Sequence, residues 1–371
     1  MITSSRRRLA LIAGAALLAV SVTVTATRWP GPEAEAAMTH QVGVAEYRLG
    51  DTAFTDPPAW PSTSELTAVV HYPKGLRRGK APLIMQLHGQ QYACATDGAT
   101  DWPCPPGVKP VLSYRGYDYL GEALARRGFV VVSLSANGIN AMMGTAPQRA
   151  KLINQHLAMW QRLSANGDGP LAGQFRDPDT GAKDPVDFRG RVDLSRVGTM
   201  GHSVAGQGVM RQASDKHRGD WPPGVTIRAV VPVASVYFEE TPGDVLITRI
   251  PYAVLGATCW SGGEQRYYER ARGLNRVPVY LASVQSGNHN FFNTVWSPSR
   301  GEFASRDDSD CPTEPNRPNE ESQRAFAVAY LTAYYEWTLR DDRRHEDQLT
   351  GARPFEVPGV TAKIEYQPPA R

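Results

Sequence analysis

Short apolar, largely β-branched runs alternate with helix-like stretches from about Leu66 to Leu339, and this alternation restricts the possible folds more than any other feature of the chain. The strand candidates are Thr67–Tyr72, Leu83–Leu87, Phe129–Ser135, Arg196–Met200, Ala229–Val233, Tyr252–Gly256 and Pro278–Ser283. Most of these runs are continuously apolar rather than alternating. Continuous apolar strands are expected where helices cover both faces of a parallel sheet.

Helical periodicity appears between and after these runs. In Tyr117–Arg127 the apolar residues form one stripe, in Gln148–Leu163 they recur at helical spacing, and a long final helix is expected over Glu320–Arg340. Gly128 follows the first of these helices, where a left-handed residue commonly ends a helix. The pattern predicts an α/β protein with a doubly wound, mostly parallel sheet and right-handed crossovers.

The first 36 residues have the three parts of a secretory signal peptide. Arg6, Arg7 and Arg8 are followed by an uncharged apolar stretch over Leu9–Ala26, and Ala34-Glu35-Ala36 offers a small-x-small cleavage pattern. The alternative is a membrane anchor, because about 18 apolar residues just span a bilayer. The Ala, Gly, Thr and Ser content and the cleavage pattern favour removal. We therefore expect an exported, secreted protein with no stable membrane insertion after cleavage.

The rest of the chain is interpreted as one domain over 37–340 and a C-terminal appendage over 341–371, within which Val360–Tyr366 is a possible edge strand. With 40 basic and 37 acidic residues, the net charge is only +3 and implies no nucleic-acid partner. The even number of cysteines in an exported chain favours disulfides. We expect Cys94–Cys104 and Cys259–Cys311 from among the three possible pairings.

Ser203 is the candidate nucleophile. The strand Arg196–Met200 continues into Gly201-His202-Ser203-Val204-Ala205-Gly206, which precedes a helix-compatible stretch. A serine between small residues at a strand-to-helix turn is typical of a nucleophile elbow, which departs here from G-x-S-x-G only in having Ala205 at its last position. The alternative is a tight connection with an incidental serine.

Two backbone N–H groups are candidates for an oxyanion hole. One belongs to Val204, directly after the serine at the expected helix N-terminus. The other belongs to Gln90, with Gln91 as the fallback, because Leu83–Leu87 ends in His88-Gly89-Gln90-Gln91 and a His-Gly turn after an early strand supplies the second donor in such sites. The alternative is a plain turn in which His88 packs locally.

The histidine base should follow the last strand. His289 lies in Ser286-Gly287-Asn288-His289-Asn290 after Pro278–Ser283, whereas His345 belongs to a charged cluster and His156 to the apolar stripe of a helix. The ring of His202, inside the elbow, is expected to point away from the substrate.

The acid of the triad is expected in the loop after Tyr252–Gly256, where it would fix the histidine tautomer. That loop holds one carboxylate, Glu264, which is our candidate, although an acidic residue there also suits the start of a helix. Asp308 and Asp310 compete, because a Cys259–Cys311 bridge would bring them near.

At these residues the chain resembles secreted bacterial α/β-hydrolases related to the dienelactone hydrolase, chlorophyllase and polyester-hydrolase (cutinase-like) branches. The resembling segments are Leu87-His88-Gly89, Gly116-Tyr117-Asp118-Tyr119-Leu120, Ser135-Ala136-Asn137-Gly138-Ile139-Asn140, Gly201-His202-Ser203 and Gly287-Asn288-His289-Asn290-Phe291-Phe292. The resemblance implies the α/β-hydrolase fold and a Ser-acid-His triad with Ser203 and His289. The resemblance does not identify the acid of the triad, because relatives have a Cys-Asp-Gly-Asp-like run where this chain has Cys259-Trp260-Ser261-Gly262.

We expect a carboxylic-ester hydrolase that forms an acyl-enzyme on Ser203, acts on a small-molecule or polymeric ester, needs no metal or organic cofactor, and is a monomer. The alternatives are a catalytically silent binding protein of the same fold, and a peptidase or amidase on the same triad. Loops 91–110 and 138–147, with Trp102, Met142 and Met143, are expected to line the substrate pocket together with Phe291 and Phe292.

Overall fold

The computed structural model describes residues 40–76, 80–96, 101–142, 145–238, 241–300, 311 and 317–371. Contacts divide the chain into Met1–Met38 and Thr39–Arg371, and all described residues belong to the second unit. The predicted signal peptide therefore lies outside the described residues. Within the described ranges, no helix is both long and apolar enough to cross a membrane.

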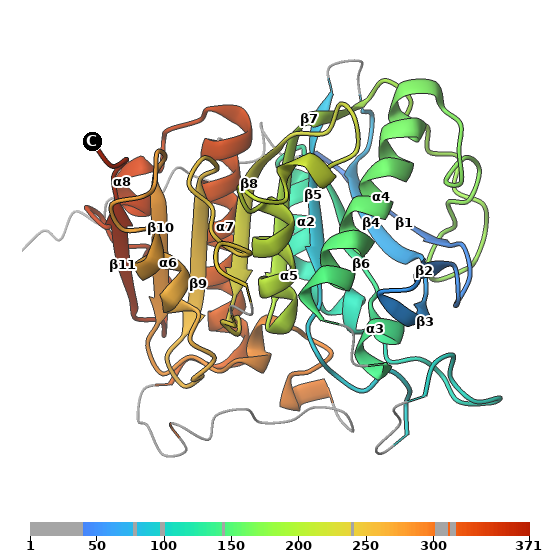
Figure 1. The fold of residues 1–371 in the computed structure, drawn as a ribbon, viewed down its shortest axis with the longest axis horizontal. Coiled ribbons are helices and arrows are strands. Elements are labelled where there is room, and N and C mark those ends of the chain that lie inside the picture. Colours follow the sequence, from blue (N-terminus) through green and yellow to red (C-terminus); the bar gives the residue numbers. More distant parts are fainter. Residues whose placement is uncertain are drawn as a thin grey trace, which may run out of the picture. The chain divides into compact units, whose positions relative to one another are not determined.

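A mixed sheet forms the centre of the unit (Figure 1). Its nine strands in the described chain run in the spatial order β1 (Val42–Arg48), β4 (Thr67–Pro73), β6 (Val130–Leu134), β5 (Ala81–Leu87), β7 (Val192–His202), β8 (Ile227–Val233), β9 (Tyr252–Ala257), β10 (Val279–Val284) and β11 (Ala362–Gln367). Six neighbouring strands, β6, β5, β7, β8, β9 and β10, pair in parallel. At the two edges of the sheet, β1, β4 and β11 pair antiparallel. The predicted mostly parallel α/β architecture is therefore present.

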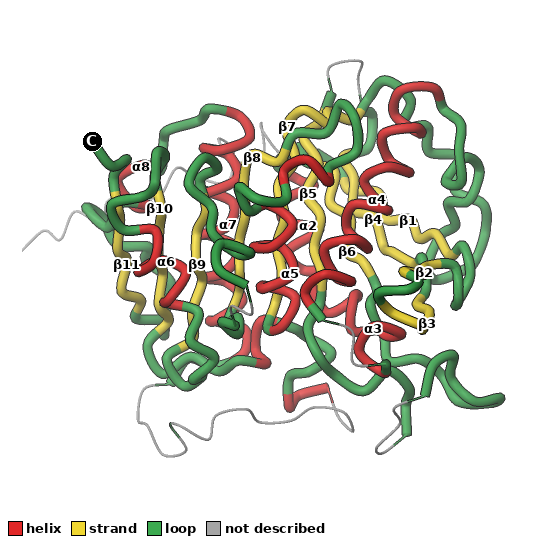
Figure 2. The backbone as a smooth tube through the Cα atoms, in the orientation of Figure 1, coloured by secondary structure: helices red, strands yellow, loops and turns green. Residues whose placement is uncertain are grey.

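Helices cover both faces of this sheet (Figures 1 and 2). One face packs against α4 (Ala146–Asn166), α5 (Val204–Ala213) and α6 (Gln265–Ala271), and the other against α2 (Asp118–Arg126), α7 (Glu320–Arg340) and α8 (Glu346–Leu349). Parallel strands buried on both sides explain why their sequences are continuously apolar. The smaller elements are α3 (Asn137–Ala141), the hairpin β2 (Phe54–Asp56) and β3 (Trp60–Ser64), and the 3₁₀ turns η1 (Ser113–Tyr117), η2 (Arg218–Asp220), η3 (Asn290–Phe292) and η4 (Pro298–Arg300).

The two edges of the sheet compare differently with the sequence analysis. β1, absent from the predicted strands, pairs with β4 along its full length, whereas β11 is the possible edge strand expected over Val360–Tyr366 and lies beside β10. The segment expected as a C-terminal appendage thus contributes a strand to the central sheet. β7 is also longer than the predicted Arg196–Met200, because its first residues pair with the start of β5.

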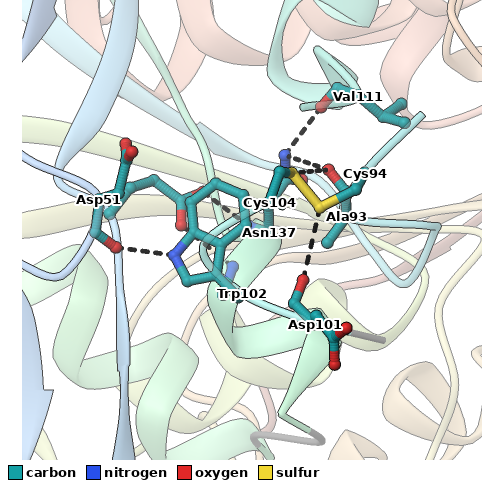
Figure 3. The surroundings of a disulfide bond; sticks show 10 residues. Asp51, Ala93, Cys94, Asp101, Trp102, Cys104, Val111 and Asn137 are labelled. Carbon is teal, nitrogen blue, oxygen red and sulfur yellow. Dashed lines mark hydrogen bonds between the residues drawn. A yellow bond between two sulfur atoms is a disulfide. The ribbon is translucent and has the colours of Figure 1, made fainter. Parts of the chain in front are cut away.

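Two disulfides are present, Cys94–Cys104 and Cys259–Cys311. The first closes a short loop after β5, and Figure 3 shows its setting: Trp102 donates its indole N–H to the carbonyl of Asp51, and the side-chain amide of Asn137 donates to the carbonyls of Ala93 and Val111. The second joins the loop after β9 to the segment before α7. Both fix loops at the carboxyl ends of the parallel strands.

Candidate active site

Ser203 occupies a strained turn between β7 and α5. Its φ is 58° and its ψ is −131°, a region that residues with side chains rarely adopt, and its backbone N–H donates to the carbonyl of Val233 at 2.9 Å. The side chain is 5% exposed. The bond to the neighbouring strand β8 holds the turn at the end of the sheet, so the hydroxyl is presented at the start of α5.

The turn is possible because several neighbouring positions have no side chain. A Cβ on Gly201 would lie 2.1 Å from the carbonyl oxygen of Ala205, and one on Gly206 would lie 2.3 Å from Ser235 Oγ. A Cβ on Gly89 would lie 2.5 Å from Ser203 Cβ and 3.2 Å from Ser203 Oγ. The loop after β5 therefore passes directly against the serine, and Ala205 fits without exposure at the one position that departs from the elbow pattern.

His202 is a structural residue within the elbow. Its Nε2 lies 3.0 Å from the carbonyl oxygen of His289 and its Nδ1 lies 2.8 Å from the hydroxyl of Tyr117. Since a carbonyl only accepts, Nε2 carries the proton and Nδ1 accepts from the tyrosine. Burial holds the pKa of His202 well below its usual range, so the ring stays neutral.

His289 lies in the loop between β10 and η3, next to the elbow. The hydrogen bond from His202 Nε2 to the carbonyl of His289 joins the backbone of His289 to the residue before Ser203. The ring centroids of the two histidines are 4.7 Å apart. His289 Nδ1 lies 2.9 Å from Asn290 Oδ1. Because this oxygen only accepts, Nδ1 carries the proton in the neutral ring and Nε2 is the basic nitrogen.

The face of His289 packs against Trp260, with ring centroids 4.1 Å apart and an angle of 32° between the planes. Backbone bonds from Thr258 to Val284 and from Cys259 to Gly287 join the loop after β9 to the loop after β10 and bring this indole to the histidine. Neither Trp260 nor Asn290 is among the site residues predicted from the sequence. Adjacency to His289 was the available signal for Asn290, whereas the position of Trp260 depends on pairing between distant loops.

Glu264 is buried at the N-terminus of α6, against β9. A Cβ on Gly256 would lie 2.9 Å from its Oε1, the backbone N–H of Ala257 and its own N–H stabilise the carboxylate, and Oε2 makes no hydrogen bond with described residues. Burial dominates these effects and raises the pKa of Glu264 to about 7. Among the described residues, the partner at His289 Nδ1 is Asn290 rather than Glu264. Asp308 and Asp310, the competing candidates, lie outside the described residues.

The two predicted oxyanion donors line one cavity of about 710 Å³. Gln90 and Val204 form its wall beside the elbow, and the remaining lining residues come from the segment around α3, from α4 and α5, and from the segment after β8: Asn140, Ala141, Thr145, Ala146, Pro147, Arg149, Gln207, Arg211, Phe238, Asp244 and Val245. Residues 140, 141 and 145–147 of the expected loop 138–147 line this cavity, whereas no described residue of the expected loop 91–110 does. Trp102, Met142, Phe291 and Phe292 do not line it, and Met143 lies outside the described residues.

Buried polar contacts hold the loop of Gln90 in place. His88 Nε2 accepts from the N–H of Ala136 and its Nδ1 lies 2.9 Å from the carbonyl of Gly89, while burial lowers the pKa of His88 to about 3. The side-chain amide of Asn140 donates to the same carbonyl at 2.8 Å, and that of Gln90 donates to the carbonyl of Asn140 at 2.9 Å. His88 is thus a neutral structural group, and the turn after β5 is fixed to the start of α3.

The other predicted non-catalytic histidines also have local partners. His156 is buried, its Nδ1 lies 2.7 Å from the Tyr47 hydroxyl, and burial lowers the pKa of His156 to about 3. His345 contacts Gln348 at the start of α8. Among the described residues, no group of three or more His, Cys, Asp or Glu side chains is placed to hold a metal ion.

The chain is similar to bacterial cutinases over part of its length. It is 25% identical over 181 residues to cutinase est2 of Thermobifida alba, 24% over 139 residues to cutinase 2 of Thermobifida cellulosilytica, and 27% over 139 residues to cutinase est1 of Thermobifida alba. These matches cover 49%, 38% and 38% of this chain and 43%, 40% and 36% of the relatives. The matched region spans about two fifths of the length of these curated relatives. No protein-family model matches the chain.

We predict that Gly201→Ala destabilises the protein by at least about 2 kcal/mol, because the new methyl group meets the backbone of Ala205, which cannot move without unwinding α5. Gly219→Ala is the matched control, since a Cβ there meets nothing within 4 Å and should change stability by less than about 1 kcal/mol. Urea unfolding of both variants measures the difference. Equal midpoints would contradict the close packing of the elbow.

We also predict a pH dependence of stability that comes from Glu264. Its pKa rises from an ordinary 4.5 to about 7 on folding, so its contribution to stability is complete below pH 4.5 and is lost as the pH rises through 7. The loss relative to Glu264→Gln should reach about 3 kcal/mol between these limits. Urea unfolding from pH 4.5 to 8 measures it, and Glu269→Gln, on the exposed side of α6, should follow the wild-type profile. Parallel profiles for wild type and Glu264→Gln would rule out the raised pKa.

Proposed function

We propose that this protein is a secreted carboxylic-ester hydrolase of the α/β-hydrolase fold, with Ser203 as nucleophile and His289 as general base. The observation that carries the proposal is the strained serine at the end of β7, with Gln90 and Val204 lining the cavity beside it. The cutinase similarity supports an ester substrate, and the N-terminal pattern and the two disulfides support export.

The proposed reaction is a two-step acyl transfer. His289 Nε2 takes the proton of Ser203 as its oxygen attacks the ester carbonyl, and the backbone N–H groups of Gln90 and Val204 stabilise the oxyanion. The imidazolium then protonates the departing alcohol. Water attacks the acyl-enzyme with His289 again acting as base, which releases the acid and regenerates Ser203.

In the proposed mechanism, Asn290 Oδ1 accepts from Nδ1 and fixes the tautomer of His289. Glu264 remains the candidate acid from the loop after β9, and the competing Asp308 and Asp310 lie outside the described residues. Trp260 contributes as well, because the face of an indole attracts a cation within about 6 Å.

A catalytically silent binding protein is the second candidate. The observation that favours it is the partly buried, neutral indole of Trp260, which packs on His289 from the loop where the acid is expected. Covalent labelling separates the two functions, because a fluorophosphonate reacts with an activated serine and not with an ordinary buried one.

We predict that a fluorophosphonate probe labels Ser203 in the folded protein and that Ser203→Ala abolishes labelling and lowers the hydrolysis of p-nitrophenyl butyrate by about 10⁴-fold or more. Ser214→Ala is the matched control, because Ser214 is equally buried but lies at the opposite end of α5. The Ser214→Ala variant should retain both fluorophosphonate labelling and hydrolysis of the ester. Absence of an adduct on wild type would support the silent binding protein, and hydrolysis of the matching p-nitroanilide at a similar rate would support the amidase.

We predict that Asn290→Leu lowers kcat for the ester about 10²- to 10⁴-fold through loss of the productive tautomer, whereas Asn290→Asp retains activity because it keeps the acceptor. Glu264→Gln should lower kcat about tenfold and remove the part of the pH–rate profile that titrates near pH 7. Steady-state kinetics from pH 5 to 9 measure these effects. Unchanged kcat in Glu264→Gln would restrict Glu264 to a structural role, and unchanged kcat in Asn290→Leu would exclude the tautomer assignment.

A further inference from the structure

Arg149, near the start of α4, places a buried positive charge in the wall of the cavity beside Gln90. The residue is 1% exposed, and burial lowers the pKa of the guanidinium to about 10. The group is therefore still protonated at neutral pH. A Cβ on Gly208 would lie 2.7 Å from Arg149 Cβ, so close packing of α4 against α5 fixes the base of this side chain.

The partners of this guanidinium are neutral. Nη2 donates to Asn140 Oδ1 at 2.8 Å and more weakly to Gln90 Oε1 at 3.4 Å. Among the described residues, Nη1 has no hydrogen-bond partner and no carboxylate forms an ion pair with Arg149. A buried charge without a counter-charge is strongly unfavourable, and a methionine or leucine would fill the same space without that penalty.

The other two charged residues in the described cavity wall, Arg211 and Asp244, form an ion pair with each other. Lys216, which does not line the cavity, also contacts Asp244 at 2.9 Å. Asp244 is thus already engaged, and Arg149 is left as the uncompensated charge among the described lining residues. An incoming anion would supply the missing partner.

We propose that the cavity is selective for esters whose acyl chain ends in a carboxylate, and that this carboxylate binds Arg149 while the ester carbonyl lies at Gln90 and Val204. The specificity rests on the proposed esterase function. The side chain of Gln90 contacts Arg149, and the backbone N–H of Gln90 is the proposed oxyanion donor. The carboxylate and the ester carbonyl of the substrate would therefore be separated by about the length of one side chain. Short dicarboxylic monoesters therefore fit better than long-chain acyl esters.

The kinetic test compares p-nitrophenyl esters of succinate, glutarate and adipate with the same compounds capped as methyl esters. Wild type should prefer the free carboxylate of the best-fitting length by roughly 10- to 100-fold in kcat/KM, mainly through KM. Arg149→Met should lose that preference and still hydrolyse the capped ester, and Arg149→Lys should retain part of it. Arg162→Met, which removes an exposed arginine from the same helix, should behave as wild type.

A binding measurement separates this proposal from the esterase function. Free glutarate should raise the melting temperature of wild type and of Arg162→Met but not of Arg149→Met, and its neutral diamide should raise none of them. If wild type cleaves no ester but glutarate stabilises it through Arg149, the esterase proposal fails and the anion site stands. If wild type cleaves capped and free esters equally and glutarate does not bind, the anion site fails and the esterase stands. If wild type cleaves no ester and glutarate does not bind, both the esterase proposal and the anion site fail.

Discussion

The imidazole of His202 connects the parts of the site that the chain supplies from distant positions. Its ring lies between the hydroxyl of Tyr117, just before α2, and the carbonyl of His289, beyond β10. Complete burial penalises the charged ring, and in the neutral ring the carbonyl of His289 requires the proton on Nε2, so Nδ1 accepts from Tyr117. The residue before the serine therefore sets the position of the backbone of the proposed base. A side chain that is not catalytic determines whether the elbow and the base meet.

Glu65 is a second buried group that connects distant segments, in the region of the proposed oxyanion donor Gln90. Both carboxylate oxygens of Glu65 accept hydrogen bonds, from the backbone N–H groups of Asn137 and Gly138 and from the hydroxyls of Ser135 and Ser64. This places α3 at the end of β6. The amide of Asn140 on α3 then reaches the carbonyl of Gly89 and accepts from the guanidinium of Arg149. The loop that carries the proposed oxyanion donor Gln90 and the buried cation of Arg149 are thus oriented by one short helix.

The sequence predicts best what depends on local pattern. Continuous apolar runs identify the seven predicted strands, six parallel and one antiparallel, because burial on both faces leaves few polar positions in them. The candidate nucleophile follows from the small residues that its strained turn requires. β1 escapes prediction because its inward and outward residues alternate weakly, and only its pairing with β4 makes it a strand.

The sequence does not show which residues lie next to each candidate residue in the folded protein. Arg149 falls within a correctly predicted helix, but its lack of a counter-charge depends on Gln90, Asn140 and Asp244, which three other segments contribute. Trp260 follows a cysteine in a loop whose partner loop is fixed by backbone bonds to Val284 and Gly287. Electrostatic statements of this kind require distances between residues far apart in the chain, and no local pattern encodes them.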